Sequence, residues 1–121
     1  MTRVLVVDDS SVIRKVARRI LEGLSLETAE ADSGQAAIEA CTADMPDGVL
    51  LDWNMPEMDG LAVLKALRKL PGGDKPKILF CTTENDFAHI AKAREAGADE
   101  TMMKPFDKEI LRVKMAAVGL I

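Results

Sequence analysis

Five polar residues of the chain have side chains that together could transfer a phosphoryl group. Each follows or ends a short run of the kind that forms a buried strand, and the set is Asp8, Asp9, Asp52, Thr82 and Lys104. Three carboxylates brought together would repel one another and raise each other's pKa values, and Lys104 supplies only one compensating charge. A divalent cation would balance the rest, and oxygen ligands favour Mg2+ or Mn2+ over Zn2+.

The chemistry that this set favours is phosphoryl transfer onto a carboxylate. Asp52 would attack the phosphorus, a metal would neutralise the developing charge, and Lys104 and Thr82 would hold the remaining oxygens. Each residue alone also has an ordinary structural interpretation. Adjacent aspartates after a strand often cap the next helix, and Lys104 before Pro105 is compatible with a simple turn. The chemical interpretation rests on the conjunction, because four predicted strands end in a group suited to one reaction.

The elements that must position these residues alternate along the chain. The expected strands are Val4–Val7, Glu27–Ala31, Val49–Leu51, Ile78–Cys81 and Glu100–Met103. Longer segments with helical spacing of apolar residues separate them. This alternation predicts an α/β fold, with a five-stranded parallel sheet, helices on both faces and right-handed crossovers. The carboxyl ends of parallel strands share one edge, where ligands bind in the crevice at which the strand order reverses.

Each expected helix begins near a residue that can cap it. These residues are Ser10 or Ser11, Ser33, Asp59, Asn85 or Asp86, and Asp107. In the first helix, Val12 and Val16 belong to an apolar face that continues to Leu24. In the fifth, we expect the inward residues to be Ile110, Val113 and Ala117.

Length and composition restrict the class of protein. The 121 residues suit one domain, residues 1–121, and the net charge of -4 argues against unaided binding to nucleic acid. No apolar run approaches the roughly 20 residues that cross a bilayer, and the first residues do not form a signal peptide. We therefore expect a cytoplasmic protein that does not enter a membrane. Cys41 and Cys81 are expected to be reduced core residues, with a redox pair as the less favoured alternative.

With these residues in place, the sequence resembles the receiver domain of two-component response regulators from end to end. Asp8 and Asp9 match the family's acidic pair, Asp52 its phosphoacceptor, Thr82 its switch hydroxyl, and Lys104-Pro105-Phe106 its terminal lysine motif. The run Asp52-Trp53-Asn54-Met55-Pro56, followed by Met58-Asp59-Gly60, is especially similar to the chemotaxis members of CheY type. The resemblance implies a flavodoxin-like, doubly wound sheet with strand order 2-1-3-4-5.

The resemblance also implies roles for particular residues. Asp9 and Asp52 would coordinate Mg2+ directly, Asn54 would add its backbone carbonyl, and Asp8 would act through water. A histidine kinase or a histidine phosphotransfer protein would donate the phosphoryl group. The peptide bond between Lys104 and Pro105 is expected to be cis, an isomer that proline makes accessible.

Three further positions bear on signalling. Asn54 and Glu84 occupy the places that tune the lifetime of the phosphorylated state, and both are the CheY-like choices, which implies a short lifetime. Thr101 stands where the family commonly has an aromatic ring that moves together with the switch hydroxyl. The resemblance implies that a target binds the face of the fourth helix, fifth strand and fifth helix. Because Thr101 cannot report the switch as a ring does, a phosphate sink or adaptor with weak switching stays open as an alternative.

Two other classes of protein fit the sequence less well. A Mg2+-dependent phosphohydrolase would need a cap insertion and a second aspartate shortly after its nucleophile, where this chain has Asn54. A flavodoxin-like electron carrier would need a phosphate-binding loop where Asp8 and Asp9 would repel the cofactor. A basic cluster on the first helix, Arg14, Lys15, Arg18 and Arg19, is interpreted either as a solvated face or as a docking surface for an acidic partner.

Overall fold

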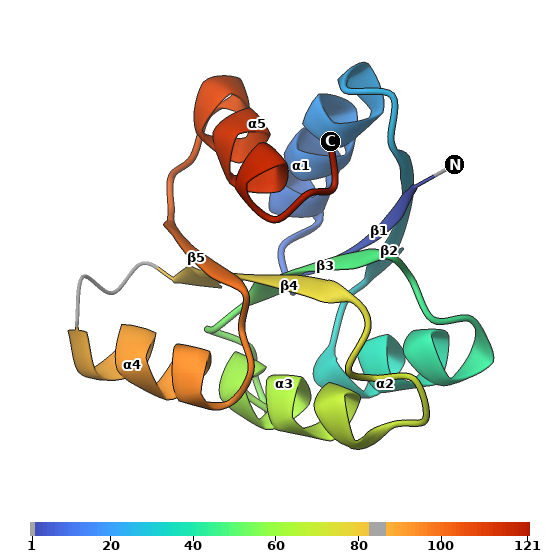
Figure 1. Cartoon of the computed structure of the whole chain (residues 1–121), viewed down its shortest axis with the longest axis vertical. Coiled ribbons are helices and arrows are strands. Elements are labelled where there is room, and N and C mark those ends of the chain that lie inside the picture. Colours follow the sequence, from blue (N-terminus) through green and yellow to red (C-terminus); the bar gives the residue numbers. More distant parts are fainter. Residues whose placement is uncertain (1, 83–86) are drawn as a thin grey trace.

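The strands form one parallel sheet in the order β2-β1-β3-β4-β5 (Figure 1). In the computed structural model, which describes residues 2–82 and 87–121, the strands are β1 (Arg3–Val7), β2 (Glu27–Ala31), β3 (Gly48–Asp52), β4 (Lys77–Thr82) and β5 (Glu100–Met103). This arrangement confirms the flavodoxin-like topology that the family resemblance implied. The strand order reverses between β1 and β3, so the crevice expected to hold a ligand lies at their carboxyl ends.

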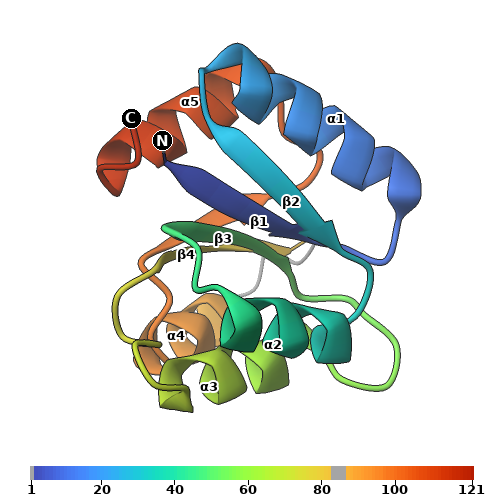
Figure 2. The same ribbon diagram turned by 90° about the vertical axis from the view of Figure 1, so that its right-hand side faces the viewer.

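Five helices cover the two faces of the sheet. They are α1 (Ser11–Gly23), α2 (Gly34–Ala43), α3 (Gly60–Lys69), α4 (Phe87–Glu95) and α5 (Lys108–Ala117). Figures 1 and 2 show α1 and α5 on one face and α2, α3 and α4 on the other. Four predicted caps are confirmed, because the side chains of Ser10, Ser33, Asp59 and Asp107 each accept a hydrogen bond from a backbone N–H three residues on. The caps predicted at Asn85 or Asp86 lie outside the described residues.

Each face of the sheet has its own apolar core. Leu51, Phe80 and Leu64 are fully buried under α2 and α3, and Leu21 and Leu111 are buried on the other side under α1 and α5. Strand β3 is buried along its whole length, as expected for a central parallel strand covered on both faces. The two cysteines are free and buried in opposite cores, Cys41 in one and Cys81 in the other. Within the described residues, no helix is long and apolar enough to cross a membrane.

The inward faces predicted for two helices were partly wrong. All three residues predicted to face inward in α5, Ile110, Val113 and Ala117, are exposed. The residues that this helix buries are Leu111 and Met115. In α1, Val12 and Val16 are 66% and 45% exposed, although both belong to the predicted apolar face. The physical reason is that the apolar stripe of each helix is wider than the strip that the sheet covers. In each helix the two buried residues are four positions apart and so lie on the same side of the helix, facing the sheet. The apolar residues on either side of them remain on the surface.

Arg68, near the end of α3, contacts the two loops that lead into β4 and β5, at the edge of the sheet opposite the carboxyl ends of the strands. Its guanidinium donates hydrogen bonds to the carbonyls of Gly97, Gly73 and Pro76 and pairs with Asp99 at 2.8 Å. We expect Arg68→Met to lower the free energy of unfolding by about 2–3 kcal/mol, because half-buried carbonyls lose their donor. Urea unfolding measures this, and Lys69→Met on the exposed neighbour is the control. If Arg68→Met lowers the free energy of unfolding no more than Lys69→Met does, the contacts of Arg68 do not stabilise the fold.

Candidate functional site

The carboxylates of Asp8, Asp9 and Asp52 meet at the carboxyl edge of the sheet. Asp8 and Asp9 follow β1 and Asp52 is the last residue of β3, and these strands are neighbours in register, with Val7 opposite Leu51. One oxygen from each carboxylate lies within 4.8 Å of the others. Asp8 and Asp52 are buried and Asp9 is exposed. Two adjacent strands therefore bring together the acidic cluster that the sequence predicted.

Lys104, directly after β5, reaches the same site from across the sheet. Its Nζ lies 2.6 Å from Asp8 Oδ2 and 2.9 Å from Asp52 Oδ1, and its side chain is largely buried. Burial lowers the pKa of Lys104, but hydrogen bonds to Asp8 and Asp52 outweigh it and raise the pKa above its usual value. The ammonium is therefore charged at neutral pH. The bond from Lys104 to Pro105 is cis, as the resemblance implied.

Asp52 combines burial with incomplete charge compensation. Burial raises the pKa of its carboxyl, and the hydrogen bond and charge of Lys104 offset that rise only in part. Asp8 acts in the other direction, because its own negative charge raises the pKa of Asp52 further. Three carboxylates thus face one ammonium, and an additional cation would relieve the repulsion. The all-oxygen donor set and the exposed Asp9 fit Mg2+, which takes one or two carboxylates and keeps several waters.

The other predicted site residues lie around this cluster. Asn54 is exposed two residues after Asp52, and Thr82 is buried at the end of β4, the strand next to β3. Thr101 is half-buried in β5 and lines a cavity of about 300 Å³ together with Thr82 and Ile110. Glu84 lies outside the described residues. The structure thus places a potential switch hydroxyl and the unusual Thr101 beside the same cavity.

The sole tryptophan is placed to sense this site. The ring of Trp53, the residue after Asp52, packs edge-on against Phe80 with centroids 4.9 Å apart, and against His89 of α4 with centroids 4.4 Å apart. Its fluorescence should therefore respond to events at Asp52 and to movement of α4.

The basic cluster predicted on the first helix divides into two parts. Arg14 and Arg18 turn toward β2 and both pair with Glu30, whereas Lys15 and Arg19 remain exposed. Arg14 also donates a hydrogen bond to the backbone carbonyl of Asp8 at 2.6 Å. Sequence reasoning missed this link to the acidic cluster. The available signal was an acidic residue, Glu30, near the end of a predicted strand, but nothing in its spacing indicates which arginine it meets.

Comparison with known proteins agrees with this geometry. Residues 4–116 match the response regulator receiver domain family. Chemotaxis protein CheY1 of Helicobacter pylori is 37% identical over 118 residues, which cover 96% of this chain and 95% of that protein. Response regulator MprA of Mycolicibacterium vanbaalenii is 39% identical over 118 residues, covering 96% of this chain but 49% of that protein. The solved structure of chemotaxis protein CheY4 of Vibrio cholerae superposes with a TM-score of 0.93 at 31% identity, covering 98% of each chain.

The family match spans nearly the whole chain, and the similarity to CheY4 extends over both the sheet and the helices. Receiver domains of this type are signalling modules of two-component systems, which sets aside the phosphohydrolase and flavodoxin alternatives. Taken with the strand order and the acidic cluster beside Lys104, this shows that the chain belongs to the response regulator receiver domain family and is CheY-like.

Proposed function

We propose that this chain is a single-domain response regulator that accepts a phosphoryl group on Asp52 and then changes its partner binding. The donor would be a histidine kinase or a histidine phosphotransfer protein. The observation that carries the proposal is the buried Asp52 carboxylate held 2.9 Å from Lys104 and beside two further carboxylates. The relatives CheY1 and CheY4 are chemotaxis proteins by name, which supports chemotaxis in the cytoplasm as the setting.

Each side chain has a distinct role in this proposal. Asp9, Asp52 and the backbone carbonyl of Asn54 would hold Mg2+, and Asp8 would act through water. The bound ion would neutralise charge on the phosphoryl oxygens. An oxygen of Asp52 attacks the phosphorus of the donor, and the bond from phosphorus to the donor's nitrogen breaks. Lys104, already beside Asp52, donates hydrogen bonds to one phosphoryl oxygen, and the Thr82 hydroxyl moves to another.

The direct test is Asp52→Asn, which keeps the shape of the side chain and removes the nucleophilic charge. With Mg2+ and acetyl phosphate, intact mass spectrometry should show one added phosphoryl group on the wild type and none on the variant. Asp74→Asn, on an exposed loop residue, is the matched control and should be phosphorylated like the wild type. A wild type without an adduct, or an Asp52→Asn variant with one, would refute the assignment.

The proposed output face is formed by α4, β5 and α5. Its support is the cavity of about 300 Å³ between Thr82, Thr101 and Ile110, since a moving Thr82 would alter the packing there. The alternative, a phosphate sink or adaptor, is favoured by Thr101, which offers no ring to fill that cavity. Hydrogen exchange with and without acetyl phosphate distinguishes them. A switch changes protection in residues 100–117, whereas a sink leaves these amides unchanged.

A further inference from the structure

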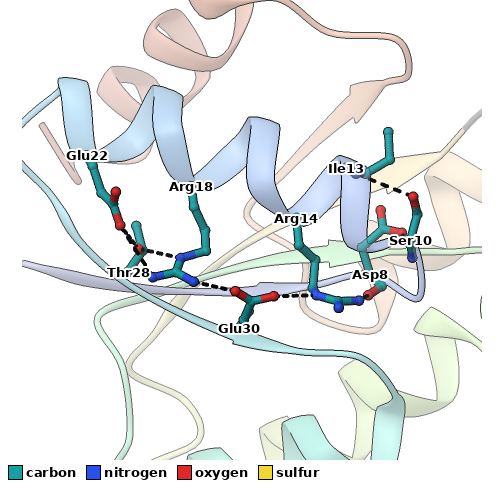
Figure 3. Close-up of polar contacts among 8 residues, drawn as sticks. All are labelled: Asp8, Ser10, Ile13, Arg14, Arg18, Glu22, Thr28 and Glu30. Carbon is teal, nitrogen blue, oxygen red and sulfur yellow. Dashed lines mark hydrogen bonds and ion pairs between the residues drawn. The ribbon is translucent and has the colours of Figure 1, made fainter.

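A row of charged side chains connects the edge strand β2 to the main chain of Asp8 (Figure 3). Arg14 lies at the inner end of the row, 13% exposed, with Nε 2.6 Å from Glu30 Oε1 and Nη1 2.6 Å from the carbonyl oxygen of Asp8. Arg18 pairs with the other oxygen of Glu30 and donates a hydrogen bond to Thr28 at 3.0 Å. Figure 3 shows Arg14 between Glu30 and Asp8, so that one guanidinium holds both.

Asp8 is held at its N–H, at both carboxylate oxygens and, through Arg14, at its carbonyl oxygen. The Asp8 N–H donates to the carbonyl of Ala31 at 3.2 Å, Oδ1 accepts from the Ser10 N–H at 2.9 Å, and Oδ2 lies 2.6 Å from Lys104. Its carbonyl, which Arg14 holds, belongs to the peptide plane that leads into Asp9. In the described part of the chain the Asp9 carboxylate has no hydrogen bond or ion pair, so the backbone that carries it is the part of Asp9 that other residues hold in place.

Glu30 compensates the positive charge of Arg14, which would otherwise weaken the binding of a cation nearby. A guanidinium close to bound Mg2+ would repel the ion, but Glu30 pairs with both Arg14 and Arg18, and Glu22 pairs with Arg18 at 3.5 Å. Two carboxylates therefore balance the two guanidinium groups. Hydrogen bonds from Arg14 and Arg18 lower the pKa of Glu30, so it stays ionised at neutral pH. The guanidinium can therefore provide a directed N–H group with little net positive charge.

We propose that Arg14 is a positioning residue for the Mg2+ site. It holds the peptide between Asp8 and Asp9 so that the Asp9 carboxylate points at the ion, and Glu30 orients the guanidinium and neutralises it. This inference rests on the proposed function, because it assumes Mg2+ at the acidic cluster. It goes further by assigning a role to residues of α1 and β2 that lie outside the acidic cluster and the lysine motif.

The test is the affinity for Mg2+, measured by calorimetry with Trp53 fluorescence in parallel. Arg14→Met keeps the apolar stem and should weaken Mg2+ binding by about 10- to 100-fold, the range for partners that orient metal ligands. Removing a positive charge alone would tighten binding, so charge loss cannot produce the expected sign. Arg14→Lys keeps the charge but not the planar fork, and it should bind Mg2+ less tightly than the wild type. Arg19→Met, on the exposed side of α1, is the matched control and should not weaken binding.

Glu30→Gln separates positioning from charge. It leaves Arg14 uncompensated, so Mg2+ binding should weaken and recover at high ionic strength, whereas the deficit of Arg14→Met should persist there. Thermal unfolding without Mg2+ identifies any variant that fails to fold. If Arg14→Met does not fold, the Mg2+ affinity of Arg14→Lys tests the inference in its place. Wild-type affinity in both Arg14 variants, or tighter binding by Arg14→Met, overturns this inference alone. A wild type that binds no Mg2+ overturns the proposed function as well.

Discussion

Replacing Lys104 by methionine is expected to slow phosphoryl transfer from acetyl phosphate to Asp52 by about 100- to 1000-fold, the usual cost of removing one donor aimed at developing charge. Lys104 Nζ is already 2.9 Å from Asp52 Oδ1, so it requires little rearrangement to hold a phosphoryl oxygen. The rate of adduct formation by mass spectrometry at saturating Mg2+ measures the effect. Lys108→Met, on the exposed start of α5, should react at the wild-type rate. An unchanged rate in Lys104→Met would remove Lys104 from the mechanism.

The same substitution should also destabilise the protein without Mg2+, by about 3 kcal/mol at neutral pH, because two buried carboxylates lose their partner. The effect depends on pH in a defined direction. Burial already raises the pKa of Asp52 above its ordinary 3.8, and losing Lys104 raises it further. The penalty relative to the wild type therefore appears as pH rises from the pKa of Asp52 in the wild type through its higher pKa in the variant, and it is smallest where Asp52 is protonated in both.

Urea unfolding at neutral pH and near pH 4 measures this dependence on pH. The difference between Lys104→Met and the wild type should shrink on acidification, and adding Asp8→Asn should recover part of the loss at neutral pH. A difference that grew on acidification would contradict the assigned ion pairs.

The convergence of the site could be predicted from the sequence because it follows from strand direction. Asp8 and Asp52 each come at the end of a buried parallel strand, so they share one edge of the sheet whatever the loops do. The neighbours of each strand could not be derived from periodicity, which does not encode strand order. The order came from the family resemblance. The burial of the strand that leads into Asp52 was likewise expected, from an apolar run too short for a helix.

Contacts between distant side chains could not be predicted. Arg14 and Glu30 are 16 positions apart, and their pairing depends on how α1 lies over β2. The exposure of Val12 and Ile110 has a similar origin, because helical periodicity gives the direction of a stripe but not how much of it the sheet covers. These residues lie outside the cores, where packing imposes the least constraint on the sequence.

Gly60→Ala should disrupt both the fold and the site, since α3 begins directly against the phosphoacceptor. A Cβ on Gly60 would lie 2.2 Å from the backbone oxygen of Asp52 and 2.8 Å from the Cα of Trp53. The Gly60 N–H also donates to the Trp53 carbonyl at 2.9 Å, so helix and loop cannot separate without losing that bond. We expect the free energy of unfolding to fall by about 3 kcal/mol, at the upper end for overpacking, because the obstacle is backbone.

Gly23→Ala is the matched control, because a Cβ there meets nothing within 4 Å in the last turn of α1. That variant should be as stable as the wild type or slightly more stable, since alanine favours the helix. Urea unfolding followed by Trp53 fluorescence measures both variants, and acetyl phosphate labelling tests the site. If Gly60→Ala folds at reduced stability, it should also label slowly, because the displaced backbone carries Asp52. Normal labelling in a destabilised Gly60→Ala would show that the Asp52 loop is held independently of α3.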